Sequence, residues 1–227
     1  MSTATAAPHS TAGTAALEGL RGLIADWSSD RRAFHVSWGK AMMWIFLLSD
    51  TFIFGSFLTG YMTVRASITA QWPNPSEVFA LHVGATQVPL LLIAIMTFVL
   101  ITSSGTMAMA VNFAYSGDRA NAAALMVVTA AFGETFVLMQ AFEWSKLLLE
   151  GMRPWENPWG AAQFGSVFFM ITGFHGLHVT GGVILLLLFA HRVLHGRADA
   201  STVEIVCLYW HFVDLVWVFI FAFFYLW

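Results

Sequence analysis

The sequence predicts an all-α integral membrane protein, a bundle of five transmembrane helices. Of its 227 residues, 58% are hydrophobic and only 10% are charged, and the mean hydropathy is +0.72. Soluble domains carry more than twice that share of charged residues, roughly a quarter. Five runs are long and apolar enough to cross a hydrocarbon core of about 30 Å as helices. These predicted spans cover residues 41–64, 87–113, 121–144, 161–190 and 204–227.

Composition also excludes several classes of function. The net charge is -3, whereas a protein that binds nucleic acid shows a basic surface. The single Cys207 excludes an internal disulfide and a cysteine-rich metal site. We find neither a phosphate-binding glycine loop nor a G-x-S-x-G nucleophile motif. We therefore predict no nucleic-acid partner and no catalytic residues in this chain.

Residues 1–38 differ in composition from the rest of the chain. The first 15 or so are small and polar, which favours disorder. The stretch from Leu17 to Trp38 mixes apolar and charged residues in the manner of an amphipathic segment that lies on a membrane surface. We accordingly predict a tail and surface segment over 1–38, and a transmembrane domain over 39–227.

The first span, 41–64, follows Lys40 and carries one acid, Asp50. Ten helical residues separate the two, which places Asp50 about 15 Å deep, near the bilayer centre. A carboxylate is costly at that depth unless it is protonated or paired. We expect a structural hydrogen bond, with proton buffering as the alternative.

The second span, 87–113, has Pro89 near its entrance, where a missing N–H does no harm. Its middle carries a polar patch whose hydroxyls can bond to their own helix or to a neighbouring one. The patch consists of Thr102, Ser103, Ser104 and Thr106.

The third span, 121–144, contains Glu134, Gln140 and Glu143. The two glutamates are nine residues apart, or about 900° of helical rotation, so they face roughly opposite sides. They cannot form one acid–base pair with each other.

The fourth span, 161–190, has two histidines near its middle, His175 and His178. Because they are three residues apart, a helix points both to roughly the same side. Small residues let another helix approach closely, so we expect this span to pack in the middle of the bundle. The glycines around the two histidines are Gly173, Gly176, Gly181 and Gly182.

The fifth span, 204–227, contains a second pair at the same spacing, His211 and Asp214. Imidazole and carboxylate groups at this spacing can ligate a metal ion or a haem. We favour structural pairing across helices instead, and lipid-headgroup binding or proton handling remain open. The residues singled out as buried and polar, structural or proton-related, are Asp50, Glu134, Gln140, Glu143, His175, His178, His211 and Asp214.

Basic residues predict the orientation. The N-terminal segment and the loops after the second and fourth spans hold seven of them, and the opposite side holds three. The positive-inside bias then places the N-terminus in the cytoplasm and the C-terminus in the periplasm of a bacterial inner membrane, as a multi-pass protein.

Four motifs in order resemble one known family. They are WIFLLSDTFIFGSF (44–57), GETFVLMQAFEW (133–144), FFMITGFHGLHVTGGVI (168–184) and YWHFVDLVWVFIFAFFYLW (209–227). Together they resemble subunit III of haem-copper terminal oxidases, over nearly everything after residue 40.

The resemblance implies a non-catalytic subunit of a proton-pumping oxygen reductase in the aerobic respiratory chain. It implies direct contact with subunit I, further contact with subunit II, and room for a small subunit IV. Haem and copper belong to the partner subunits in this family, and this chain itself would hold no metal or cofactor. It further implies bound phospholipid, support of subunit I during turnover, and support of proton uptake and of lipid or oxygen access.

Two features depart from the family's mitochondrial pattern. Mitochondrial-type members have seven helices, and this chain matches only the last five. Asp50 after serine resembles the quinol-oxidase version, whereas Gln140-x-x-Glu143 resembles the cytochrome c version. We favour a cytochrome c oxidase, with an o-type quinol oxidase or an accessory protein of a nitric oxide reductase as alternatives. A free-standing transporter is disfavoured, because neither a broken helix nor an inverted repeat is apparent.

Overall fold

The computed structural model describes residues 37–83 and 86–226. It confirms an all-helical membrane architecture, with five helices in the described residues that are long and apolar enough to cross a bilayer. They are α3 (Trp38–Ser67), α5 (Leu91–Tyr115), α6 (Arg119–Leu149), α7 (Ala162–Leu194) and α8 (Ala200–Tyr225). The disordered tail and amphipathic segment predicted for 1–38 lie almost wholly outside the described residues.

The chain divides into two units, Met1–Ile45 and Phe46–Trp227. The described part of the first unit is essentially the beginning of α3. All packing discussed below lies within the second unit.

The helices run past the predicted spans at most of their ends. Glycines with positive φ follow α5 and α6, Gly117 at 82° and Gly151 at 95°. At each, the next residue donates its N–H to a carbonyl five residues back, Asp118 to Phe113 and Met152 to Leu147. These bonds define Schellman ends, and glycine suits them because it adopts the left-handed conformation without a steric penalty.

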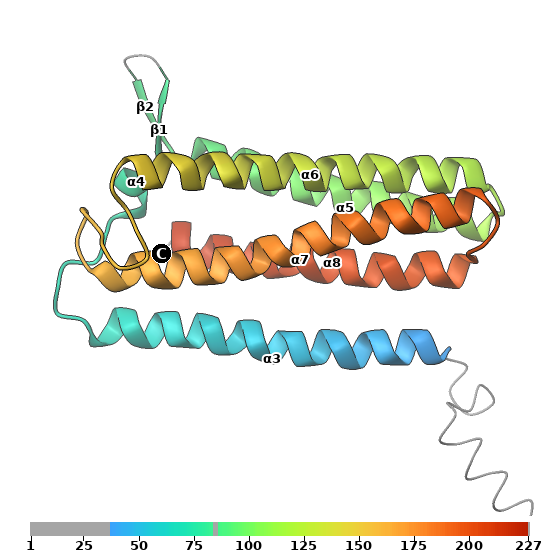
Figure 1. The fold of residues 1–227 in the computed structure, drawn as a ribbon, viewed down its shortest axis with the longest axis horizontal. Coiled ribbons are helices and arrows are strands. Elements are labelled where there is room, and N and C mark those ends of the chain that lie inside the picture. Colours follow the sequence, from blue (N-terminus) through green and yellow to red (C-terminus); the bar gives the residue numbers. More distant parts are fainter. Residues whose placement is uncertain (1–36, 84–85, 227) are drawn as a thin grey trace, which may run out of the picture. The chain divides into compact units, whose positions relative to one another are not determined.

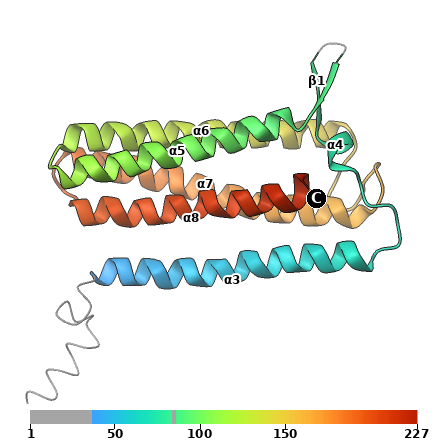
Figure 2. The ribbon, with the colours of Figure 1, turned by 180° about the vertical axis from the view of Figure 1, so that it is seen from behind.

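The entrance to the second span differs from the prediction. Thr86–Pro89 forms strand β2, which pairs antiparallel with β1 (Ala80–Val83) after a short helix, α4 (Pro75–Val78). The helix α5 begins only at Leu91 (Figure 2). Pro89 accounts for the difference, because a proline disfavours helical backbone at the residue before it. The predicted helix start at residue 87 was therefore wrong.

Four helices form a closed ring in which each packs against two others. The contacting pairs are α5 with α6, α6 with α7, α7 with α8, and α8 with α5. From Phe46 onward, α3 runs alongside α7 and α8 (Figure 1). It meets them through aromatic side chains: Phe54 lies 5.3 Å from Phe174, and Tyr61 lies 4.2 Å from Phe224, between ring centroids. Large rings rather than close backbones join α3 to the ring of four.

Trp210 of α8 fills the centre of the ring of four. Its Nε1 donates a hydrogen bond to the Ser103 hydroxyl of α5 at 2.9 Å. Its ring lies against Gly133 of α6 and Gly182 of α7, where no side chain intervenes. A polar tip and two glycines thus let three helices close around one large side chain, which is itself fully buried.

Apolar side chains cover the outside of the helices. Phe52, Phe98 and Leu177 each leave about 70% of their surface exposed, at 69%, 70% and 70%. Lipid tails solvate such side chains, so this pattern matches helices that face a bilayer.

Replacing Gly133 with alanine tests the packing around Trp210. A Cβ at this position would clash with the Trp210 ring and lie 2.8 Å from Val183 Cγ2. We expect Gly133→Ala to destabilise the protein by about 1–3 kcal/mol, the usual cost of overpacking, as a lower midpoint of thermal unfolding in detergent. Gly105→Ala is the control, because its Cβ meets nothing within 4 Å. Equal midpoints for the two variants would contradict the close packing.

Candidate functional site

A buried acid of α3 contacts a histidine of α7. Asp50 Oδ2 lies 2.9 Å from His178 Nε2. Asp50 is 5% exposed, and His178 stands sixteen residues from each end of α7. The contact therefore joins the two helices near the middle of the bilayer. Asp50 is therefore hydrogen-bonded to another helix, and a structural role for this bond stays a prediction.

The second nitrogen of His178 restricts the protonation of this pair. His178 Nδ1 lies 2.8 Å from the backbone carbonyl of Phe174, which can only accept a hydrogen bond. Nδ1 therefore carries a proton. The bond to Asp50 is then either an imidazolium with a carboxylate or a neutral imidazole with a carboxylic acid. Both states share one proton and have no net charge, which is the form that a bilayer tolerates best.

Neighbouring groups hold the His178 side of this contact. The Tyr209 hydroxyl of α8 donates to the backbone carbonyl of His178 at 2.9 Å. The rings of Phe54 and Phe174 flank the imidazole, with centroids 5.4 and 4.7 Å away. Residues from three helices thus surround the Asp50–His178 contact.

His175 does not take part in this contact. Its Nε2 donates to the backbone carbonyl of Val213 on α8 at 3.1 Å, and the side chain is almost fully buried. The two histidines of α7 therefore bond to different helices, α8 and α3. Over the residues that the structure describes, no three His, Cys, Asp or Glu side chains gather where they could hold a metal ion.

His211 and Asp214 of α8 also bond to different partners. Asp214 accepts a hydrogen bond from Ser104 of α5 at 2.6 Å. His211 instead donates through Nδ1 to the Cys207 carbonyl of its own helix at 2.9 Å. The polar patch of the second span bonds in both ways expected of it: Thr102 bonds to its own helix, and Ser104 reaches its neighbour.

The polar residues of α6 lie on different faces. Glu143 is 3% exposed and accepts a hydrogen bond from the Tyr225 hydroxyl at 3.3 Å, whereas Glu134 is exposed. The two glutamates therefore face different sides, as the helical period predicts. The prediction that Glu134 is buried was wrong, because its side of α6 is exposed. Gln140 is buried, and neither atom of its amide has a hydrogen-bond partner among the described residues.

Sequence patterns did not identify Tyr209 and Tyr225. Both act through a hydroxyl at the tip of a long ring, so their partners lie on other helices and no spacing along α8 reveals them. Their only signal is polarity within an otherwise apolar aromatic run. Taken together, the buried polar groups can join helices, and the Asp50–His178 contact can also hold one exchangeable proton.

Comparison with known proteins identifies relatives of the chain. The family described as cytochrome c oxidase subunit III matches residues 29–227. A protein of Mycobacterium tuberculosis named probable cytochrome c oxidase subunit 3 is 35% identical, over 78% of this chain and 82% of its own length. A cytochrome bo(3) ubiquinol oxidase subunit 3 of Pseudomonas putida is 31% identical, over 81% and 83%. A probable quinol oxidase subunit 3 of Staphylococcus epidermidis is 32% identical, over 85% and 90%.

A double-mutant cycle tests the Asp50–His178 contact. Asp50→Leu and His178→Leu each leave a polar partner without its bond, so each should cost about 1–3 kcal/mol of stability. The double variant should cost less than the sum of the two, because no polar group is then left alone. Thermal unfolding in detergent measures all three. Ser49→Ala is the control, since that hydroxyl bonds only to its own helix at Phe46. Additive losses would show that the two side chains do not interact.

Proposed function

Because the chain belongs to the cytochrome c oxidase subunit III family, we propose that it acts as the non-catalytic third subunit of a proton-pumping haem-copper oxygen reductase. In this role it binds subunit I directly, alongside subunit II and with room for a small subunit IV. Haem and copper reside in those partners, and phospholipid binds to this chain. The complex lies in the bacterial inner membrane, and the described part of this multi-pass subunit has five helices long and apolar enough to cross it.

The Asp50–His178 contact is the observation that supports this role. A subunit that stabilises a larger one must present a fixed surface, and α3 meets the ring of four mainly through side chains. A hydrogen bond of 2.9 Å near mid-membrane, among aromatic rings, holds α3 in one position. The same pair can take up or release a proton within the membrane. We therefore propose both stabilisation of subunit I and support of proton uptake.

Cytochrome c is the electron donor that we propose, on the strength of the Gln140-x-x-Glu143 pattern. The relatives named as quinol oxidase subunits favour a second candidate, quinol, because they match the chain over a similar length and at similar identity.

We also propose that the N-terminus lies in the cytoplasm. The end of α5, the start of α6, the end of α7 and the start of α8 lie at one end of the ring of four (Figure 1). The basic residues Arg119, Arg192 and Arg197 belong to this end or follow it, which supports a cytoplasmic side.

Asp50→Asn distinguishes the two proposed roles of Asp50, which are to hold an exchangeable proton and to join α3 to α7. An asparagine can still donate to His178 Nε2, so the complex should assemble with its usual subunits. The exchangeable proton is lost, and an internal proton matters most where protons are scarce. Oxygen reduction should therefore slow more steeply at high pH than in the unchanged protein, whereas Asp50→Leu should also lose subunits. An unchanged pH profile in Asp50→Asn would remove the proton role and leave the structural one.

Purification through an N-terminal tag tests the assignment as a whole. In mild detergent, the tagged chain should bring down a large subunit with haem and copper, visible in the reduced-minus-oxidised spectrum. A dinuclear copper site in subunit II identifies cytochrome c as donor, and its absence identifies quinol. Protection of the tag from protease in right-side-out vesicles tests the orientation. A colourless chain that emerges alone after gentle extraction would contradict the proposed complex.

A further inference from the structure

A groove lies between α6 and α7 on the outside of the ring of four. Its volume is about 190 Å³, several times that of a water molecule. From Phe136 to Trp144 it follows nine residues of α6, whose eight steps rise about 12 Å along the helix. Ala141 and Thr180 are exposed at its margin, so it opens toward the bilayer. The groove is therefore long, narrow and accessible from the membrane.

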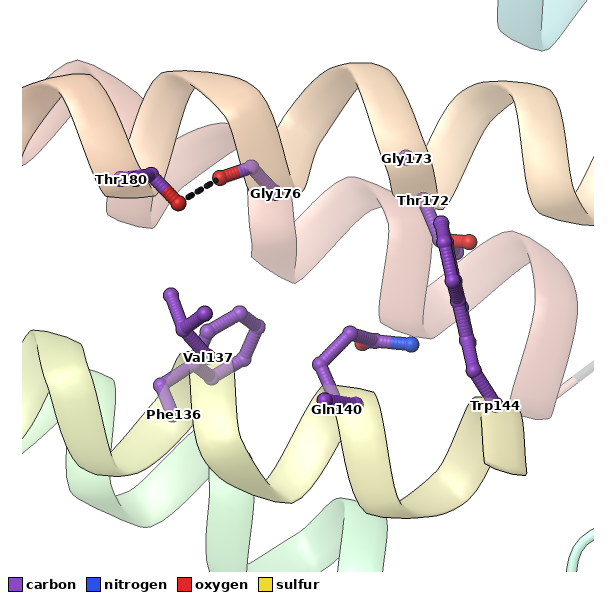
Figure 3. A pocket seen from close by; sticks show the side chains of 9 residues that line it. Phe136, Val137, Gln140, Trp144, Thr172, Gly173, Gly176 and Thr180 are labelled. Carbon is purple, nitrogen blue, oxygen red and sulfur yellow. Dashed lines mark hydrogen bonds between the residues drawn. The ribbon is translucent and has the colours of Figure 1, made fainter. Parts of the chain in front are cut away.

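One end of the groove is polar. Gln140 is 6% exposed, and both its amide atoms are buried without a partner in the described part of the chain. The same holds for Trp144 Nε1, whose ring lies against Gly173. Figure 3 shows the Gln140 amide in the space between the two helices, with its nitrogen toward Trp144. Buried polar groups left unpaired cost about 1–3 kcal/mol each. Two of these three atoms, Gln140 Nε2 and Trp144 Nε1, are donors, so this end is suited to a ligand that accepts hydrogen bonds.

The other end of the groove is apolar. Phe136 and Val137 line it from α6, and Gly176 lines it from α7. The Thr180 hydroxyl donates to the Gly176 carbonyl at 2.8 Å, so it is already used within its own helix (Figure 3). This end offers surface for a hydrocarbon chain.

The polar end is the end nearer the membrane surface. Lys146 Nζ donates to the carbonyl of Ala80, at the base of the hairpin between the first two described spans. Gln140 lies six residues deeper, about 9 Å along the helix. The headgroup region of each leaflet is roughly 5–8 Å thick, so Gln140 lies close to the boundary where phospholipid ester groups meet the acyl chains.

We propose that this groove binds one ester-linked phospholipid. The ester carbonyl accepts hydrogen bonds from Gln140 Nε2 and Trp144 Nε1, and the acyl chain follows Phe136 and Gly176 toward Thr180. The polar end of the groove lies near the membrane surface and its apolar end lies deeper, as the ester group and acyl chain of a lipid in this leaflet require. The site rests on the proposed function, which includes bound phospholipid, and refines it by naming the groove between α6 and α7 where one such lipid lies. A quinone or a partner helix could offer similar carbonyl chemistry, and the test separates these sources.

Lipid counting by native mass spectrometry tests the site. The purified protein, with whatever subunits accompany it, is stripped of lipid and titrated with dioleoylphosphatidylcholine or with its di-ether analogue, which lacks the carbonyls. Gln140→Leu removes the amide, and Gly176→Leu fills the groove at a Cβ that meets nothing within 4 Å. Gly105→Leu is the matched control, as its Cβ is equally open on α5.

Unchanged protein and Gly105→Leu should bind one more ester lipid than Gly176→Leu. Gln140→Leu should bind that lipid about tenfold more weakly, the loss expected from roughly 1.4 kcal/mol of hydrogen bonding. The ether analogue should bind unchanged protein as weakly as the ester binds Gln140→Leu. Thermal unfolding of stripped Gln140→Leu should occur no lower than that of stripped unchanged protein, because an unpaired amide has been removed.

Three results would overturn the proposal. In the first, all four proteins bind the same number of ester lipids, or ether and ester lipids bind alike. In the second, a quinone in the organic extract disappears with Gln140→Leu while the lipid count stays constant. In the third, the side chain introduced by Gly176→Cys cross-links to another subunit in the intact complex. The readout is bound lipid, so these results are independent of whether the chain belongs to a working oxygen reductase.

Discussion

A bilayer core supplies no hydrogen-bond partners, and this constraint governs how the chain places its polar side chains. A polar group in a span must find its partner on its own helix, on another helix, or in a molecule that enters from outside. Asp50 poses the most demanding case, because a lone carboxylate near mid-membrane is expensive. Its contact with His178 at 2.9 Å resolves that cost and at the same time joins α3 to the remaining helices.

The remaining polar groups follow the same constraint in different ways. Ser103 and Trp210 pair inside the ring of four, where glycines make room for the indole. Glu143 and Tyr225 pair across α6 and α8. Gln140 finds no partner among the described residues and lines a groove on the membrane side instead. Most of these polar groups thus form hydrogen bonds between helices of the same chain. This suits a subunit that supports chemistry carried out elsewhere.

The five spans could be predicted because hydropathy and length depend only on local sequence. The opposite faces of Glu134 and Glu143 could be predicted as well, since they follow from the helical period alone. The hydrogen-bond partners of the buried polar side chains could not be predicted. His175 and His178 share a side of α7, yet a small difference in direction sends one to Val213 and the other to Asp50. Such pairings depend on how neighbouring helices are rotated, which no single span encodes. The predicted start of α5 was wrong for a local reason. Pro89 restricts the backbone of the residue before it, whereas the prediction considered only its missing N–H.

The position of α3 depends on the bond from Asp50 to His178 Nε2, while His178 Nδ1 bonds to the Phe174 carbonyl. Nitrogen-15 NMR of protein labelled at its eight histidines tests it most directly, with His178→Gln to assign the signals. We expect a protonated Nδ1 for His178, and an Nε2 signal that shifts in Asp50→Leu but not in Ser49→Ala. An Nε2 signal that is unchanged by Asp50→Leu would show that the two side chains do not meet, and the basis for holding α3 in place would be lost.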